Sequence, residues 1–340
     1  MKHTVYLLTG AAGLLGSNVC RALLARGASV RALVLPGDPA ARFVPDGAEV
    51  FQGDVTDPAS LERFFALPEG TERVVLHCAS IVTLSPEPSR KVYEVNVTGT
   101  ENLVELCLSH GVKKLVYVSS TGAIPEAETG RAITEPERFD PDGVVGYYSK
   151  TKALATQYVL EAARERGLNA SVVYPSGICG PNDYAFGPVA GVILKYCAGE
   201  IPVGVEGTFN SVDVRDLADG VLACAEKGRP GEGYIMSNQL VTLREMFELI
   251  SDASGAPRVE RFLPVEAMRR MMAAQLPDGP EKEQRLAAFD FGTYNLVHNN
   301  DFSCEKARRE LGYHTRPFAD TIRDEVAWLA DIGKLAKRPA

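Results

Sequence analysis

The sequence lacks the features that mark membrane and secreted proteins. Within its 340 residues, no apolar run reaches the roughly 18–20 residues that a membrane-spanning helix needs. The first residues show neither the apolar core nor the small-residue cleavage site of a signal peptide. We therefore expect a cytoplasmic protein with no membrane partner.

Cysteine and histidine are few and scattered. The seven cysteines are an odd number and form no CxxC pair, and the five histidines form no HxxxH or HExxH spacing. Most cysteines stand inside apolar runs, so we expect buried free thiols and no metal site. Positive charge is also in deficit, because the net charge is −8 and the pI is about 5.3. This balance disfavours a nucleic-acid partner.

Short apolar runs alternate with helix-length segments over the first 180 residues. This alternation predicts an α/β fold, a Rossmann-type doubly wound parallel sheet with helices on both faces. We expect residues 1–180 to form a dinucleotide-binding domain, to which 209–235 return, and 181–340 to form mainly a smaller, helical substrate lobe. The expected strands are Val5–Thr9, Ser29–Leu35, Glu49–Gln52, Val74–His77, Leu115–Ser119, Ala170–Val173 and Gly233–Ser237. The main expected helices are 14–26, 59–66, 94–110, 148–166, 189–197, 214–226, 243–253, 303–311 and 319–332.

A glycine-rich turn follows the first expected strand and opens the first expected helix. In Thr9-Gly10-Ala11-Ala12-Gly13-Leu14-Leu15-Gly16, the glycines permit a tight turn and close approach of the backbone to a pyrophosphate. The helix N-terminus then offers free N–H groups to the phosphates. We expect a nicotinamide dinucleotide here. The alternative is that the glycines merely end a strand.

The second strand normally ends in the group that reads the adenosine ribose, an acid for NAD or a base for NADP. Leu35 stands at that place, with Asp38 shortly after it. Arg31 and Arg42 are candidate cations for a 2′-phosphate. Asp38 and Arg42 can equally be a turn residue and a solvated charge. The absent acid favours NADP(H) slightly over NAD(H).

Two further strand ends offer cofactor contacts. Asp54, followed by Val55, ends the third strand, where a carboxylate can accept from the adenine amino group; capping the next helix is its alternative role, although Asp57 is better placed for that. Cys78-Ala79-Ser80 follows the fourth strand, and small residues there let the backbone run beside the cofactor. His77 is expected to be a structural histidine.

Tyr148 and Lys152 stand four residues apart at the start of a long expected helix. That spacing places both side chains on one helix face. A phenol with a pKa of about 10 is a poor base near neutrality. A lysine ammonium beside it, together with a positive nicotinamide ring, lowers that pKa and makes the tyrosine a proton-transfer group. Singly, such a pair is often only a core tyrosine and a surface lysine.

A hydroxyl is needed to orient the reacting carbonyl or alcohol oxygen. Ser120, at the end of the strand from Leu115, is our candidate, with Thr121 as the reserve. Ligands gather outside the carboxyl ends of parallel strands, which is where both residues stand. The glycine turn, the serine and the tyrosine–lysine pair occur together, which makes coincidence improbable.

These motifs resemble those of the extended short-chain dehydrogenases/reductases, also known as the NAD-dependent epimerase/dehydratase family. The resemblance covers nearly the whole chain and includes TGAAGLLG (9–16), GDVTD (53–57), HCAS (77–80), YVSST (117–121), YSKTK (148–152), PSGICGP (175–181) and FNSVDVRDLADG (209–220). Within the family, the chain is most similar to dihydroflavonol reductases and 3β-hydroxysteroid dehydrogenases. Tyr174 replaces an arginine found in many relatives, and Leu35 replaces the arginine of the flavonol-type reductases.

The resemblance implies a catalytic set of Ser120, Tyr148 and Lys152, assisted by Asn96. It places Pro175, Ser176 and Gly177 beside the nicotinamide amide. It also implies an NAD(P)-dependent oxidoreductase, which can form a homodimer through the helices from Glu94 and Tyr148. The expected cofactor contacts are Thr9, Gly10, Gly13, Leu14, Leu15, Gly16, Arg31, Leu35, Asp38, Arg42, Asp54, Val55, Cys78, Ala79, Ser80, Tyr148, Lys152, Pro175, Ser176, Gly177 and Ile178.

The expected substrate is a flat apolar ketone or secondary alcohol, steroid-like or polyphenolic. Residues 182–205 contain one cation, Lys195, whereas a nucleotide-sugar diphosphate needs several. We expect Ile81, Thr121, Gly122, Tyr184, Phe186 and Val189 to line the substrate pocket. Two other functions remain open: a nucleotide-sugar epimerase or dehydratase that recycles its NAD, and a non-catalytic cofactor-sensing protein.

Overall fold

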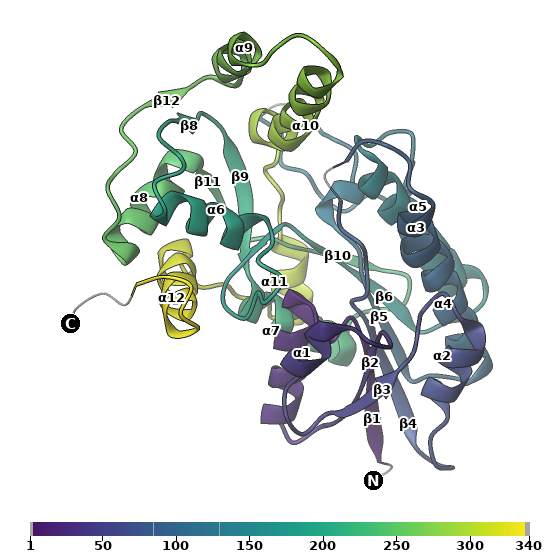
Figure 1. Cartoon of the computed structure of the whole chain (residues 1–340). Coiled ribbons are helices and arrows are strands. Elements are labelled where there is room, and N and C mark those ends of the chain that lie inside the picture. The colour runs from purple at the N-terminus through teal and green to yellow at the C-terminus, as the bar shows by residue number, and fades with distance from the viewer. Residues whose placement is uncertain (1–2, 84, 129, 337–340) are drawn as a thin grey trace.

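A seven-stranded parallel sheet forms the centre of the chain in the computed structural model, which describes residues 3–83, 85–128 and 130–336 (Figure 1). The strand order is β10-β6-β5-β4-β1-β2-β3. The order reverses between β1 and β4, and ligands bind at such a reversal, outside the carboxyl ends of the strands. The strands are β1 (Thr4–Thr9), β2 (Ser29–Val34), β3 (Glu49–Gln52), β4 (Glu72–His77), β5 (Lys114–Val118), β6 (Ala170–Pro175) and β10 (Gly233–Met236).

Helices cover both faces of this sheet because successive strand residues point to opposite sides. Leu7 packs in one apolar cluster with α2 (Pro58–Phe65), α4 (Gly99–Ser109) and α5 (Tyr147–Glu165). Its neighbour Leu8 packs in the other, with α1 (Leu14–Ala25), α7 (Val214–Lys227) and α11 (Glu305–Leu311). The Rossmann-type architecture expected from the sequence is confirmed.

The segment before α4 differs from the single helix expected over 94–110. A short helix, α3 (Arg90–Tyr93), is followed by a π-helical turn over Glu94–Thr98 and then by α4. Such turns are rare and occur frequently at functional sites. The wide turn contains Asn96, whose side chain is buried.

The remaining elements form a smaller region with a separate apolar core. Its sheets are β7-β9-β11 and β8-β12, and α6, α8 and α12 share its core. β10 returns from this part of the chain to pair with β6 of the large sheet. None of the described helices is long and apolar enough to cross a membrane. The bounds are β7 (Gly177–Cys179), α6 (Pro188–Cys197), β8 (Gly204–Val205), β9 (Thr208–Asp213), β11 (Gln239–Thr242), α8 (Leu243–Ser254), β12 (Phe262–Leu263), α9 (Val265–Gln275), α10 (Pro280–Val297) and α12 (Phe318–Asp331).

Candidate active site

The glycine turn packs directly against the end of β4. Gly10 has a φ of +71°, and a Cβ there would lie 2.6 Å from the backbone nitrogen of Ala79. Gly13 N donates to the Gly10 carbonyl (3.1 Å), and a side chain at Gly16 would strike the same carbonyl. Gly13 caps α1 without any side chain, which leaves the first N–H groups of that helix available. This backbone cradle suits a pyrophosphate.

Beyond β2, the residues expected near the adenosine ribose have different surroundings. Leu35 is half exposed. Asp38 accepts from Ala40 N (2.8 Å) and so caps the 3-10 turn Pro39–Phe43. The guanidinium of Arg42 lies over the Phe43 ring, 4.7 Å from its centroid. Arg42 is an exposed cation in the 3-10 turn that follows β2 along the chain.

Arg31 is committed to contacts elsewhere. Its guanidinium pairs with Glu49 (3.0 Å) and donates to the carbonyls of Phe64 (3.0 Å) and Ala66 (2.7 Å). The structure therefore does not bring Arg31 together with Arg42 at the end of β2. Asp54, after β3, accepts from the amide and hydroxyl of Thr56, each at 2.8 Å.

A buried histidine joins the ends of β1 and β4. His77 Nδ1 lies 2.7 Å from Thr9 Oγ1, and His77 Nε2 lies 3.0 Å from Thr100 Oγ1. Burial lowers the pKa of His77 to about 3, so its ring is neutral. Thr9 Oγ1 also accepts from Ala79 N (3.2 Å), which fixes the backbone beside the glycine turn. His77 is structural, as expected.

Tyr148 lies in the first turn of α5 with two serines around its phenol. The side chains of Ser120 and Ser80 lie close enough to its hydroxyl to oppose the rise in its pKa that burial causes. Ser120 Oγ also accepts from Gly122 N (3.0 Å), which holds the serine in place at the end of β5. The sequence predicted Ser120 as the residue that orients the substrate oxygen, and the structure places it near the phenol of Tyr148. The contact with Ser80 was missed, because nothing in HCAS distinguishes a serine beside the cofactor from one beside the tyrosine.

Asn96 links the segments that carry Ser80 and Tyr148. Its Oδ1 accepts from Ser80 Oγ (3.1 Å) and Ile81 N (2.8 Å), and its Nδ2 donates to Thr151 Oγ1 (3.1 Å). Thr151 in turn donates to the carbonyl of Tyr148 (2.7 Å). The amide therefore links β4, the π-helical turn and α5. Ile81 contributes its backbone to this network and is not among the residues that line the pocket described below.

Lys152 is buried one helical turn after Tyr148. Its Nζ donates to the Val118 carbonyl (2.7 Å) and lies 4.7 Å from the centroid of the Tyr117 ring. Burial lowers the pKa of Lys152 to about 7, and burial raises the pKa of Tyr148 to about 12. The expected lowering of the tyrosine pKa is therefore not found in the protein alone. The buried ammonium keeps its charge most readily when an acceptor or a phenolate lies nearby.

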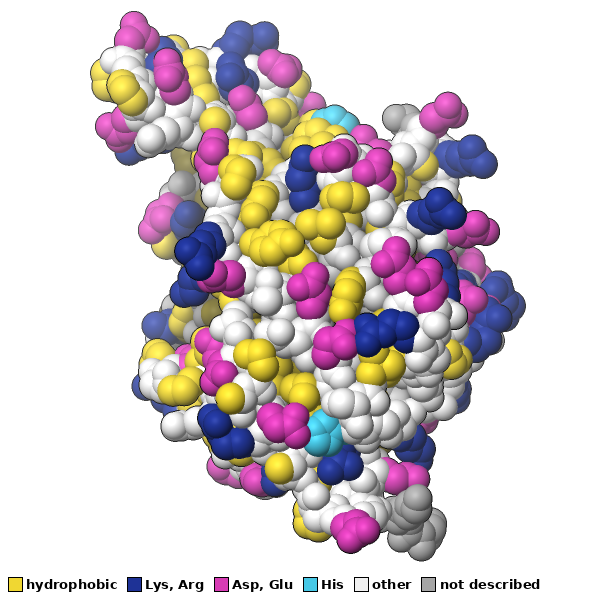
Figure 2. Space-filling view, turned by 90° about the vertical axis from the view of Figure 1, so that its right-hand side faces the viewer, with side chains coloured by type: hydrophobic (Ala, Val, Ile, Leu, Met, Phe, Trp, Pro, Cys, Tyr) yellow, Lys and Arg dark blue, Asp and Glu magenta, His cyan; other side chains and the backbone are white. Residues whose placement is uncertain are grey.

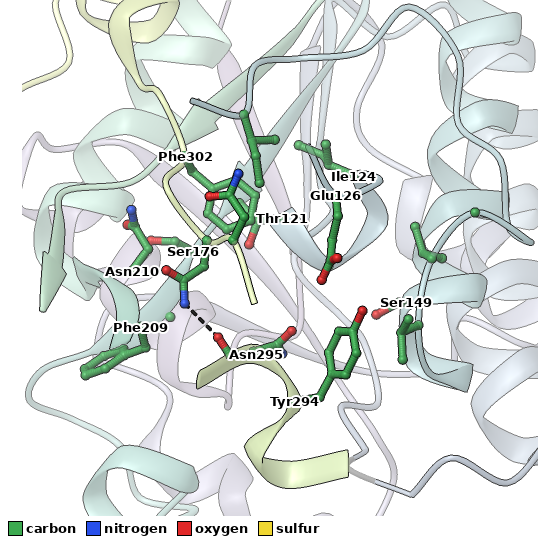
Figure 3. Close-up of a pocket in the computed structure, with 18 residues that line it drawn as sticks. Thr121, Ile124, Glu126, Ser149, Ser176, Phe209, Asn210, Tyr294, Asn295 and Phe302 are labelled. Carbon is green, nitrogen blue, oxygen red and sulfur yellow. Dashed lines mark hydrogen bonds between the residues drawn. The ribbon is translucent and has the colours of Figure 1, made fainter. Parts of the chain in front are cut away.

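A pocket of about 270 Å³ opens beside this centre (Figure 3). Its walls include Thr121, Gly122 and Ser149, which adjoin the reacting residues in sequence. Figure 3 shows Glu126, Ser149 and Tyr294 on one side, and Phe209, Asn210 and Ser176 on the other. The full lining is Thr121, Gly122, Ile124, Glu126, Ile133, Gly143, Val144, Val145, Ser149, Ser176, Gly177, Phe209, Asn210, Tyr294, Asn295, Asn299, Asn300 and Phe302.

Besides Ile81, three more of the residues expected in the substrate pocket are not among its lining residues. Tyr184 stacks on Phe43 with ring centroids 3.9 Å apart, and Trp328 touches both Tyr184 and Phe186. Val189 packs against the core of the smaller region. The far wall is formed instead by residues 209–210, which open the 209–220 motif but were not predicted to line the pocket, and by residues 294–302, which no sequence motif marked.

Comparisons with known proteins agree with this geometry. The profile of the "NAD dependent epimerase/dehydratase family" matches residues 6–237. Sterol demethylase protein B of Methylococcus capsulatus is 31% identical over 97% of this chain and 99% of its own. A 4-hydroxy-2-methyl-3-oxo-4-farnesyl-3,4-dihydroquinoline-1-oxide ketoreductase of Stigmatella aurantiaca is 30% identical over 91% of each chain. The crystal structure of gox2253 is 30% identical, with a TM-score of 0.82 over 98% of this chain and 100% of that one.

Proposed function

The chain belongs to the NAD-dependent epimerase/dehydratase family, the extended short-chain dehydrogenases/reductases, and is an NAD(P)-dependent oxidoreductase; from this premise we propose that it interconverts a ketone and a secondary alcohol on a flat, largely apolar molecule. The observation that carries the proposal is the phenol of Tyr148 close to the side chains of Ser120 and Ser80, with Lys152 buried one turn further on. This is a proton-transfer centre beside a pocket of small-molecule size.

Each residue of the centre has a distinct task. When bound, the nicotinamide supplies or accepts the hydride. Ser120 donates a hydrogen bond to the substrate oxygen and polarises it. Tyr148 gives its proton to that oxygen in reduction and removes it in oxidation. With a pKa raised to about 12, the phenol is protonated at neutral pH and is ready to act as the acid.

The residues that would hold the cofactor follow from the backbone cradle. Gly10, Gly13 and the N-terminus of α1 suit the pyrophosphate, and Cys78 to Ser80 border the same crevice. Arg42 is the side chain best placed to meet a 2′-phosphate, and no acid stands at position 35. We therefore favour NADP(H). Replacing Arg42 with Gln should raise KM for NADPH and leave KM for NADH nearly unchanged; equal KM values for both cofactors in each protein would contradict this preference.

The pocket walls support the choice of substrate. Among the lining residues, all of which belong to the described part of the chain, none is Lys or Arg, and Glu126 would repel a diphosphate. Phe209, Phe302 and Ile133 supply apolar surface. Two relatives of the chain are named for a sterol and for an oxo-dihydroquinoline, both of which are fused-ring molecules.

A screen of cyclic ketones and alcohols with both cofactors, read by nicotinamide absorbance, tests the function. Net oxidation or reduction of the cofactor is expected. Turnover of a nucleotide sugar without net cofactor change would instead support an epimerase or dehydratase. Cofactor binding with no turnover of any carbonyl compound would support a non-catalytic sensor.

Whether α4 and α5 form a dimer interface is answered by the mass of the protein in solution; a monomer at micromolar concentration would count against it.

A further inference from the structure

Two buried polar atoms in the pocket wall have no hydrogen-bonding partner in the described chain. They are Ser176 Oγ and Asn210 Oδ1. Ser176 is 8% exposed and Asn210 is 6% exposed, so neither side chain is solvated like a surface group. A buried polar atom without a partner is unfavourable, and a native structure keeps few of them. Both residues line the same pocket.

The pairing of β7 with β9 places the two side chains next to each other. β7 and β9 run parallel, and Gly177 pairs with Ser211, so Ser176 stands one position before this pair beside Asn210. Paired positions in parallel strands point to the same face. The contact is close, since a Cβ at Gly177 would lie 2.8 Å from the Asn210 carbonyl. Figure 3 shows both side chains on one wall of the pocket.

Other polar side chains of the pocket already have partners. Asn300 donates to the carbonyls of Thr208 (2.9 Å) and Asn295 (2.7 Å). Asn299 donates to three carbonyls of the 127–131 segment. Burial and the neighbouring Glu126 carboxylate raise the pKa of Tyr294 to about 12. These contacts hold the pocket walls together, whereas Ser176 and Asn210 present hydrogen-bonding capacity that the protein does not use.

We propose that Ser176 and Asn210 together bind a hydroxyl group of the substrate that is separate from the reacting oxygen. This proposal rests on the proposed function and narrows its substrate class to hydroxylated cyclic ketones and their alcohols. A hydroxyl is the smallest group that serves both residues, because it donates to Asn210 Oδ1 and accepts from the Ser176 hydroxyl. The apolar walls at Phe209 and Phe302 cover the ring between the two polar ends.

The pair therefore determines specificity. A substrate without the second hydroxyl leaves both buried atoms unpaired in the complex, and sites built to bind a hydroxyl reject such analogues. The expected discrimination is about 10- to 100-fold in kcat/KM, which corresponds to one buried hydrogen-bonding group left without a partner.

The experiment compares steroid-like ketones that differ by one ring hydroxyl remote from the carbonyl. Wild-type protein is expected to prefer some hydroxyketone over its deoxy counterpart. Asn210→Leu and Ser176→Ala are each expected to reduce that preference at least fivefold, mainly by lowering kcat/KM for the hydroxyketone. Asn295→Leu, at an exposed position of the same pocket, is the matched control and is expected to keep the preference.

Three results would overturn the proposal in different ways. If the wild type reduces no ketone, the proposed function itself fails. If the wild type reduces ketones but the two variants keep every hydroxyl preference, the function stands and the binding role of the pair is wrong. If the variants weaken cofactor binding, measured by fluorescence titration without substrate, and slow all ketones equally, the pair binds the nicotinamide amide instead. Retained thermal stability of Asn210→Leu shows that the loss is not one of folding.

Discussion

The side chain of Ser80, just beyond the end of β4, lies close to the phenol of Tyr148. Ser80 donates to Asn96 Oδ1 (3.1 Å), so its oxygen is free to accept from the tyrosine while its own proton is occupied. Two serines can therefore orient the tyrosine hydroxyl: Ser120, and Ser80, which is anchored to Asn96 in the π-helical turn.

Removal of the phenolic hydroxyl should stop the chemistry. We expect Tyr148→Phe to lower kcat by about 10²–10⁴-fold or more, the range typical of a lost general acid. Cofactor binding, measured by fluorescence titration, should remain. Tyr147→Phe, one residue earlier and outside the tyrosine–lysine spacing, is the control and should stay close to wild type. Comparable activity in both variants would remove Tyr148 from the mechanism.

Ser80 makes a smaller contribution than Tyr148 because it orients the phenol and does not react. We expect Ser80→Ala to lower kcat about tenfold, with KM for the ketone changed little, as for one lost hydrogen bond. Ser80→Thr should restore part of the rate because it retains the hydroxyl. A fall in kcat of equal size in both variants would show that packing at this position, and not the hydroxyl, matters.

The reaction centre could be predicted from the sequence because its parts are local. The glycine turn, Ser120 and the Tyr148–Lys152 pair each stand at a strand end or on one helix face, where short-range rules apply. The pocket could not be predicted in the same way. Its far wall, around Asn210 and Tyr294, comes from β9 and α10, and only tertiary packing brings these elements to β5 and α5.

The prediction for Tyr184 and Phe186 failed to place them in this pocket for a related reason. Aromatic residues shortly after a strand of a large sheet are typical of a ligand site, but these two contact Trp328 of α12. Trp328 stands more than 140 residues later in the chain, and the sequence gives no indication of which later helix returns to cover these aromatic residues. The π-helical turn at Asn96 could not be predicted either, because one irregular turn leaves the helical sequence pattern almost unchanged.

The glycine cradle makes position 10 sensitive to one methyl group. Gly10→Ala places a Cβ 2.6 Å from Ala79 N in a backbone with φ +71°. Gly37 has a similar φ of +73°, but a Cβ there would have no atom within 4 Å. Gly37→Ala therefore measures the cost of the backbone conformation alone, without a steric clash. We expect Gly37→Ala to lose about 1 kcal/mol of stability. Gly10→Ala should lose more and should bind cofactor at least tenfold more weakly, as measured by thermal unfolding and cofactor titration. Equal effects of the two substitutions would show that the close approach has no importance.

A buried acid on α12 makes stability depend on pH. Glu325 accepts from Gly180 N (2.8 Å), and burial, with Asp183 and Asp213 nearby, raises its pKa from 4.5 to about 8. Between these values the folded protein holds a proton that the unfolded chain releases, so this residue's contribution is full below pH 4.5 and is lost as pH rises through 8.

Glu325→Gln should remove this dependence because the amide accepts the same hydrogen bond and has no charge. We expect similar stability of variant and wild type near pH 5 and a more stable variant near pH 9. The difference in unfolding free energy between the two proteins near pH 9 should not exceed about 5 kcal/mol, because one pKa unit corresponds to about 1.4 kcal/mol. Denaturant unfolding at the two pH values measures it. Parallel loss of stability in both proteins between these pH values would show that Glu325 is not the source.

Residues 80–152 supply the whole proton-transfer centre, whereas the opposite wall of the pocket is formed by residues 209–210 and 294–302. Selection acting on the second group can therefore change the molecule that is accepted without disturbing the chemistry performed on it. Grafting the 289–302 segment from one family member onto another should therefore transfer the substrate range of the donor protein and leave the reaction of the recipient unchanged.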